Sequence, residues 1–150
     1  MELQQISGLW HIYATNFPMW LSGKRTNPTF QYTLDKYEKG IRLIDVVSYH
    51  QNGNFKTING YDFPLNKANT AFEWRGKGWM YFIKSKWKII HVSPDEEWMI
   101  IYFEKTLFTP KGFDVITRCK DPSEKIRAEI KTFLSENRNI PTLKALNPQG

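Results

Sequence analysis

The sequence predicts an all-β protein, an eight-stranded antiparallel up-and-down β-barrel followed by one C-terminal α-helix. Three observations predict this fold class. Short runs rich in β-branched and aromatic residues recur along the chain, turn residues separate them, and one amphipathic helical pattern follows the last run. The chain has 150 residues, the length of one ordinary domain, so we expect a single domain over 1–150.

Eight runs are predicted to be strands. The breaks between them contain Gly, Pro or Asn, which impose or tolerate turn dihedrals. Connections this short favour antiparallel neighbours, and eight such strands close into a barrel without exposed sheet edges. A β-sandwich is the alternative that the pattern leaves open. The eight runs are 8–15, 29–36, 41–49, 54–62, 70–75, 86–92, 98–106 and 112–118.

A helix is predicted over 122–137. Asp121 suits the N-cap and Pro122 the first helical position, and Glu124 follows the cap by three residues. Apolar residues then recur at helical spacing along one side, which can cover an outer face of the barrel. The tail 140–150 is expected to add one short strand within 140–146.

Composition and charge narrow the class of protein further. No apolar run approaches the ~20 residues that a membrane-spanning helix requires. The first residues lack the basic and apolar parts of a signal peptide, and the single cysteine, Cys119, can form no internal disulfide, so we expect a cytoplasmic protein. The formal net charge of +6 comes from scattered Lys and Arg rather than from a basic tract, so no nucleic-acid partner is expected.

The search for catalytic and metal-binding motifs is negative. His11, His50 and His91 lie far apart without metal-ligand spacing, and no Walker, dinucleotide or G-x-S-x-G motif is present. We therefore expect no cofactor, no metal and no catalytic residue. One alternative stays open: Asp114 and His91 could face the interior and perform acid–base chemistry on an apolar substrate, as in a barrel enzyme.

Aromatic residues make up 15% of the chain, an excess that predicts either a β-rich core or an apolar cavity. Alternate residues of a strand share one face, so Phe30 and Tyr32 form one inward stripe and Phe72 and Trp74 another. The functional interpretation is a ligand pocket, and a solid core is the alternative. The residues predicted to line the pocket are Ile12, Ala14, Phe30, Tyr32, Tyr49, Tyr61, Phe72, Trp74, Ile100 and Tyr102.

The loop 16–28 carries four large apolar side chains in a segment expected to be exposed. We interpret it as a lid over an open barrel end, with Phe17 and Trp20 at its rim. Lys24 and Arg25 beside them could attract an anionic headgroup. The same combination suits contact with a membrane surface, or an interaction module that uses 17–25 to bind a protein.

Several motifs resemble those of the lipocalin family, in the calycin superfamily. Gly8-Leu9-Trp10 resembles its G-x-W signature, 53–60 is similar to its second hairpin motif, and 113–118 resembles its last strand. The resemblance is closest to bacterial or intracellular lipocalins without disulfides. It implies that Gly8, Trp10 and Arg118 close one end of the barrel. It also implies binding, transport or sequestration of a small hydrophobic molecule, such as a fatty acid, another lipid or a pigment, by a monomer or weak dimer.

Overall fold

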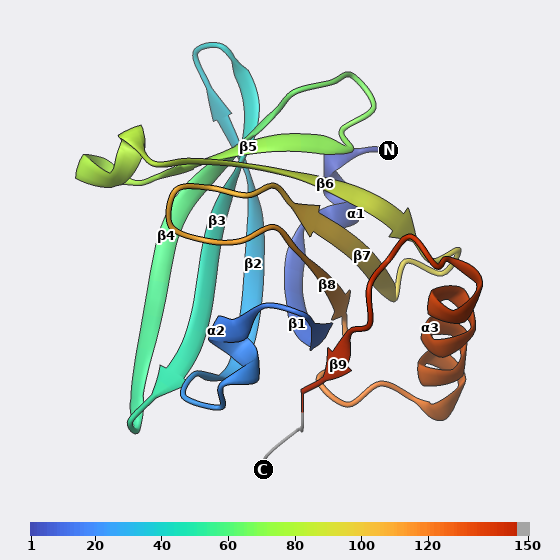
Figure 1. The fold of residues 1–150 in the computed structure, drawn as a ribbon. Helices are drawn as coiled ribbons and strands as arrows, with labels where there is room; N and C mark the ends of the chain where they lie inside the picture. The colour runs from blue at the N-terminus through green and yellow to red at the C-terminus, as the bar shows by residue number, and fades with distance from the viewer. Residues whose placement is uncertain (147–150) are drawn as a thin grey trace.

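The computed structural model describes residues 1–146, which form a closed eight-stranded antiparallel barrel with one helix on its outer face (Figure 1). Consecutive strands pair with each other, and β1 pairs with both β8 and β2, which closes the sheet. The predicted fold class is confirmed. The barrel strands are β1 (Gly8–Thr15), β2 (Thr26–Tyr37), β3 (Gly40–Gln51), β4 (Asn54–Pro64), β5 (Ala71–Gly76), β6 (Lys84–Val92), β7 (Trp98–Phe103) and β8 (Gly112–Thr117).

The strand ends lie within two residues of the prediction except at two places, where they differ by three residues for local reasons. β7 ends three residues early because the Thr106 hydroxyl accepts hydrogen bonds from the backbone N–H of Phe108 and Thr109, at 3.2 and 3.0 Å, and so closes a turn. β2 begins three residues early, at Thr26, because a bulge with Asn27 at a φ of 52° lets the pairing with β3 continue.

The helix α3 (Glu124–Glu136) lies where a helix was predicted, but Ser123 caps it and Asp121 does not. The Ser123 hydroxyl accepts a hydrogen bond from the N–H of Ile126 at 3.3 Å, whereas Asp121 pairs with Arg127. The apolar side of α3 packs on the outer faces of β1, β7 and β8, at the right of Figure 1.

One end of the barrel is closed by the short helix α1 (Leu3–Ile6), which the sequence did not predict, and by the contact between Trp10 and Arg118. The Arg118 guanidinium lies 3.6 Å from the Trp10 ring centroid, and it donates hydrogen bonds of 2.9 Å to the carbonyls of Ser7 and Gln5. A side chain at Gly8 would begin 3.0 Å from this guanidinium, so glycine fits there. The stacking that the resemblance implied is therefore present.

Three further elements lie in the connections and the tail. The helices α2 (Pro18–Leu21) and η1 (Gly78–Phe82) lie at the end of the barrel opposite α1, and neither was predicted as a helix. The short strand β9 (Lys144–Ala145) pairs with β1, within the predicted 140–146. The last part of the predicted tail, 147–150, lies outside the described residues. Among residues 1–146 no helix combines the length and apolarity needed to cross a bilayer.

Candidate functional site

A cavity of about 210 Å³ lies inside the barrel at the end opposite α1. Inward-facing residues of β2 to β8 form its wall, α2 lies across it, and the 104–111 loop borders its mouth. Its lining is mostly apolar, with two carboxylic acids among the inward positions. The residues that line it are Phe17, Met19, Trp20, Phe30, Asp45, Val47, Ile58, Trp74, Ile83, Lys84, Ser85, Phe103, Thr106, Phe108, Thr109 and Asp114.

A stack of aromatic rings fills the middle of the barrel and forms the floor of the cavity. The Trp87 ring stacks between those of Phe72 and Tyr32, with centroids 4.5 and 5.7 Å away, and Tyr32 stacks in turn on Phe30 at 5.9 Å. Since Tyr32, Phe72 and Trp87 are at most 2% exposed, they leave no space for a ligand below Phe30. The interior is thus a solid core in its middle and hollow only at the open end.

The helix α2 is held over the cavity at both of its ends. On one side the Phe17 ring packs directly on Gly112, where a Cβ atom would lie only 2.5 Å from that ring, and Asn16 accepts a hydrogen bond of 2.8 Å from the N–H of Phe113. On the other side Trp20 packs edge-on against Tyr49, with centroids 5.8 Å apart. Phe17 and Trp20 are each 5% exposed. The expectation that this loop exposes its large apolar residues is wrong for these two, because α2 turns them into the barrel.

Two acidic side chains face the cavity from inward positions of the strands. Asp45 lies between the inward residues Leu43 and Val47 of β3, and Asp114 lies on β8. Both are almost fully buried, at 4% and 1% exposure. One carboxyl oxygen of each, Oδ1, has no hydrogen-bond partner among the described residues. Buried polar atoms are normally paired, so these two oxygens indicate a ligand or solvent group in the cavity.

The environment of these acids favours their protonated forms. Burial raises the pKa of Asp114 to about 7, and a hydrogen bond with the Thr15 side chain opposes the rise. Burial likewise raises the pKa of Asp45 to about 6, opposed by a hydrogen bond with Asp62. A third buried acid, Asp62, lies in the floor, where it accepts a hydrogen bond of 2.9 Å from Trp87 Nε1. Burial and the nearby Asp45 raise its pKa well above the usual range.

Six of the ten residues predicted to line the pocket point into the barrel. Phe30 and Trp74 line the cavity itself. Trp74 can lie across β4 because Gly60 has no side chain there: a Cβ atom would come within 2.4 Å of the indole. The other four belong to the core around or below the cavity, namely Ile12, Tyr32, Tyr49 and Phe72.

The remaining four predicted lining residues point away from the barrel interior, which corrects the assignment of their faces. A bulge between Ile12 and Ala14 turns Ala14 outward, and it packs with Ile100 beneath α3. Tyr102 lies on the same outer face of β7, against Phe113. Tyr61 lies outside β4, where the Arg42 guanidinium is 3.9 Å from its ring centroid.

The predicted cationic residues of the loop lie at the mouth. Arg25 lies over the Tyr49 ring, 5.0 Å from its centroid, and Lys24 is exposed. His91 is not at the cavity: its ring stacks on Phe133 of α3, with centroids 4.0 Å apart, outside the barrel. The acid–base pair of His91 and Asp114 considered from the sequence is therefore not assembled.

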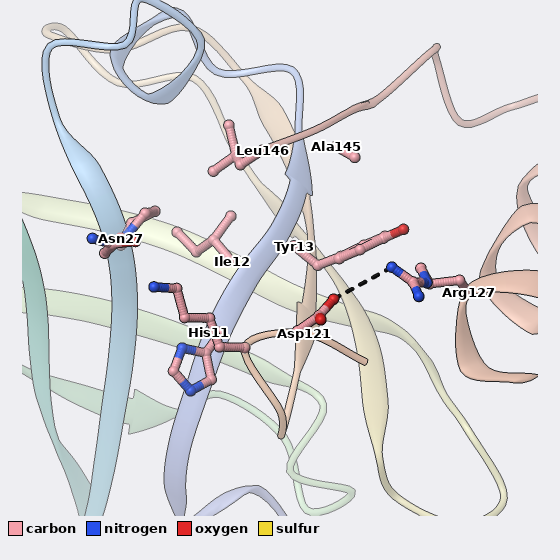
Figure 2. A pocket seen from close by; sticks show the side chains of 10 residues that line it. His11, Ile12, Tyr13, Asn27, Asp121, Arg127, Ala145 and Leu146 are labelled. Carbon is pink, nitrogen blue, oxygen red and sulfur yellow. Dashed lines mark hydrogen bonds and ion pairs between the residues drawn. The ribbon is translucent and has the colours of Figure 1, made fainter. Parts of the chain in front are cut away.

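A second hollow, of about 140 Å³, lies outside the barrel between β1, the start of β2 and β9 (Figure 2). Its charged side chains are exposed, and two of them, Asp121 and Arg127, pair with each other at 3.3 Å. It offers no buried atom in need of a partner. Within 1–146 no group of three His, Cys, Asp or Glu side chains is placed to hold a metal ion.

A barrel of this topology, with its flanking helix and one end closed by a Trp–Arg contact, has the lipocalin fold. Three solved structures show it. Insecticyanin from the tobacco hornworm Manduca sexta has a TM-score of 0.75 at 12% identity, over 99% of this chain and 82% of that one. The bovine lipocalin allergen Bos d 2 has a TM-score of 0.64 at 14% identity, over 97% of this chain and 95% of that one. The siderocalin Ex-FABP has a TM-score of 0.68 at 12% identity, over 97% of this chain and 96% of that one. The sequence matches no protein-family model and no curated protein.

Sequence reasoning missed several residues of the site, chief among them Asp45, Val47, Ile58 and Phe103. Asp45 had a usable signal, because it interrupts the otherwise apolar run 43–47 at an inward position. Val47 and Ile58 had no such signal, because the sequence does not distinguish an apolar residue on the inner face of these strands from one on the outer face.

Proposed function

We propose that this protein binds a small, largely apolar molecule in the barrel cavity. The observation that carries the proposal is the hollow behind α2, walled by Trp20, Phe30, Val47 and Ile58. An apolar cavity of ~150 Å³ takes up benzene. The volume of about 210 Å³ therefore suits a molecule of one or two rings, and an extended fatty acid exceeds it.

The physical driving force is transfer of the ligand from water to an apolar site that is already formed. A ligand that buries on the order of 300 Å² gains roughly 7 kcal/mol before the costs of association. The fold is consistent with such a role: the siderocalin Ex-FABP, which shares it, is described as functioning through dual ligand specificities. Transport or sequestration would both begin with this binding step.

A cavity-filling substitution tests the proposal. Propylbenzene is expected to bind in calorimetry with a stoichiometry of one, and Val47→Phe is expected to weaken that binding at least about tenfold, because the new ring occupies the hollow. Ile58→Phe, from the strand position paired with Val47, is a second variant expected to do the same.

The matched control is Val46→Phe, which adds the same ring to the outer face of β3. It should bind propylbenzene as the unmodified protein does. Thermal unfolding of all variants shows whether each is folded. Failure of propylbenzene to bind, or equal binding by the Val47 and Val46 variants, would contradict a ligand site in the barrel.

The two other functions considered from the sequence have less support. An acid–base enzyme would need a second titratable group beside Asp114, and the candidate for that role, His91, lies outside the barrel. An interaction module at 17–25 would need exposed apolar side chains to contact a protein, whereas Phe17 and Trp20 are buried.

A further inference from the structure

We propose that the cavity selects an apolar molecule that carries a primary amine, and that the buried carboxylate of Asp45 or of Asp114 holds its ammonium group. This inference rests on the proposed function and names the chemical class of the ligand. It is carried by the two buried carboxyl oxygens that face the cavity without a partner.

The chain supplies no counter-ion for these acids within 1–146. Its recorded ion pairs join other residues, and Lys84, which lines the mouth, is exposed and makes no ion pair with either carboxyl. A carboxylate in an apolar site is stabilised most by a charged donor. A primary ammonium presents three N–H donors on a compact centre, so it can donate to an unpartnered Oδ1 atom at the cavity wall.

Three ligands of matched size test the inference: phenethylamine, propylbenzene and 3-phenylpropionate, each titrated calorimetrically at about pH 8, above the pKa values of both acids. The amine is expected to bind at least about tenfold more tightly than propylbenzene, and the carboxylate at least about tenfold more weakly. The asparagine variant of the acid that holds the ammonium, Asp45→Asn or Asp114→Asn, should remove most of the preference for the amine. Thermal unfolding of both variants shows whether each is folded.

The outcomes separate this inference from the proposed function. Propylbenzene binding without preference for the amine overturns the inference and leaves the cavity function standing. Equal affinity for the amine in the unmodified protein and both variants also overturns it. Failure of all three ligands to bind overturns both.

The surface around the cavity mouth is here called the open-end rim. It is made up of 16–25, 50–56, 77–84 and 104–111. These segments carry seven of the 21 Lys and Arg residues but only one of the 15 acidic residues, so they account for the whole formal net charge of +6. None of the seven cations takes part in an ion pair recorded among the described residues.

The open-end rim also holds the most exposed large apolar side chains in 1–146. All five such residues that are more than 60% exposed lie on it: Phe55, Trp79, Phe82, Leu107 and Phe108. They come from three different connections, of which η1 projects at the far left of Figure 1 and the β3–β4 hairpin forms its lower left tip. Exposed apolar side chains gathered in this way indicate a surface that meets a partner.

We infer that the open-end rim docks on an anionic lipid bilayer. Aromatic and aliphatic side chains interleaved with lysines match the boundary between lipid headgroups and acyl chains, and anionic lipids attract the cations. A second copy of this chain is a poorer occupant, since two surfaces that each carry a formal net charge of +6 repel each other. Docking in this way would place the cavity mouth at the bilayer.

Vesicle flotation tests this second inference. The protein is expected to float with phosphatidylcholine vesicles that contain phosphatidylserine, and at least about tenfold less with phosphatidylcholine alone. The pair Lys77→Glu and Lys105→Glu, and separately Trp79→Ser with Phe82→Ser, should lower binding at least about tenfold. The matched control pair, Lys39→Glu and Lys67→Glu, makes the same charge change at the closed end and should bind normally.

Absence of binding to the phosphatidylserine vesicles would overturn the inference. Equal losses in the rim and control pairs would also overturn it, because net charge alone would then account for binding. Sedimentation that shows a dimer abolished by the rim variants would assign the surface to a second copy instead, and so reject the lipid partner.

Discussion

Replacing Trp10 with alanine is expected to lower the free energy of unfolding by about 4 kcal/mol. The Trp10 side chain is fully buried, so the substitution leaves a cavity at the closed end of the barrel. It also removes the hydrogen bond of 2.9 Å from Nε1 to the Ile6 carbonyl, and the ring on which Arg118 stacks. Urea unfolding measures the change, which is a large part of the ~5–15 kcal/mol that holds a domain together.

Trp79→Ala is the matched control for this prediction. It removes the same side chain from η1, where Trp79 is 78% exposed, and should change the free energy of unfolding by less than about 0.5 kcal/mol. Similar losses in the two variants would mean that Trp10 does not close the barrel as described.

The second large effect concerns pH. Asp114 has a pKa of about 7 in the folded protein and an ordinary value of 3.8 once exposed by unfolding. Between these values the folded protein keeps a proton that the unfolded chain releases, so stability should fall as pH rises from about 4 to 7 and then level off. At 1.36 kcal/mol per pKa unit the fall from Asp114 is about 4 kcal/mol. Asp114→Asn removes it, so the variant should be at least as stable as the unmodified protein at about pH 8.

The pKa values of Asp45 and Asp62 are also raised, so these acids lower stability in the same direction as pH rises. Asp114→Asn should therefore reduce the loss of stability with rising pH without abolishing it. Asp95→Asn is the control, because hydrogen bonds from Ser93 and the backbone lower the pKa of this exposed acid. It should leave the fall between pH 4 and 7 unchanged. Urea midpoints across this range give the comparison, and an unaltered profile for Asp114→Asn would show that Asp114 is not buried as described.

Most of the barrel could be predicted from residue patterns, because β-branched runs and turn residues act locally. The closing Trp10–Arg118 contact was accessible only through the family resemblance, since the two residues lie far apart in the chain. The short helices α1 and α2 were not predictable, because four residues are too few for a periodic pattern to show.

The site was harder to predict than the fold, because it depends on which face of each strand points inward. On β7 both faces are apolar: Met99 and Ile101 face the core, while Trp98 and Ile100 face α3, and the sequence alone does not say which is which. On β1 the bulge after Ile12 reverses the alternation. An acid on an inward stripe, such as Asp45, is the kind of local contradiction that marks a functional position.

The most direct measurement is the position of bound propylbenzene, found from nuclear Overhauser effects between ligand and protein protons. Contacts are expected with Trp20, Phe30 and Ile58, which surround the hollow behind α2. Contacts confined to the outer hollow near His11, or no contacts in the barrel at a concentration that saturates binding, would contradict the claim that the open end of this barrel holds the ligand.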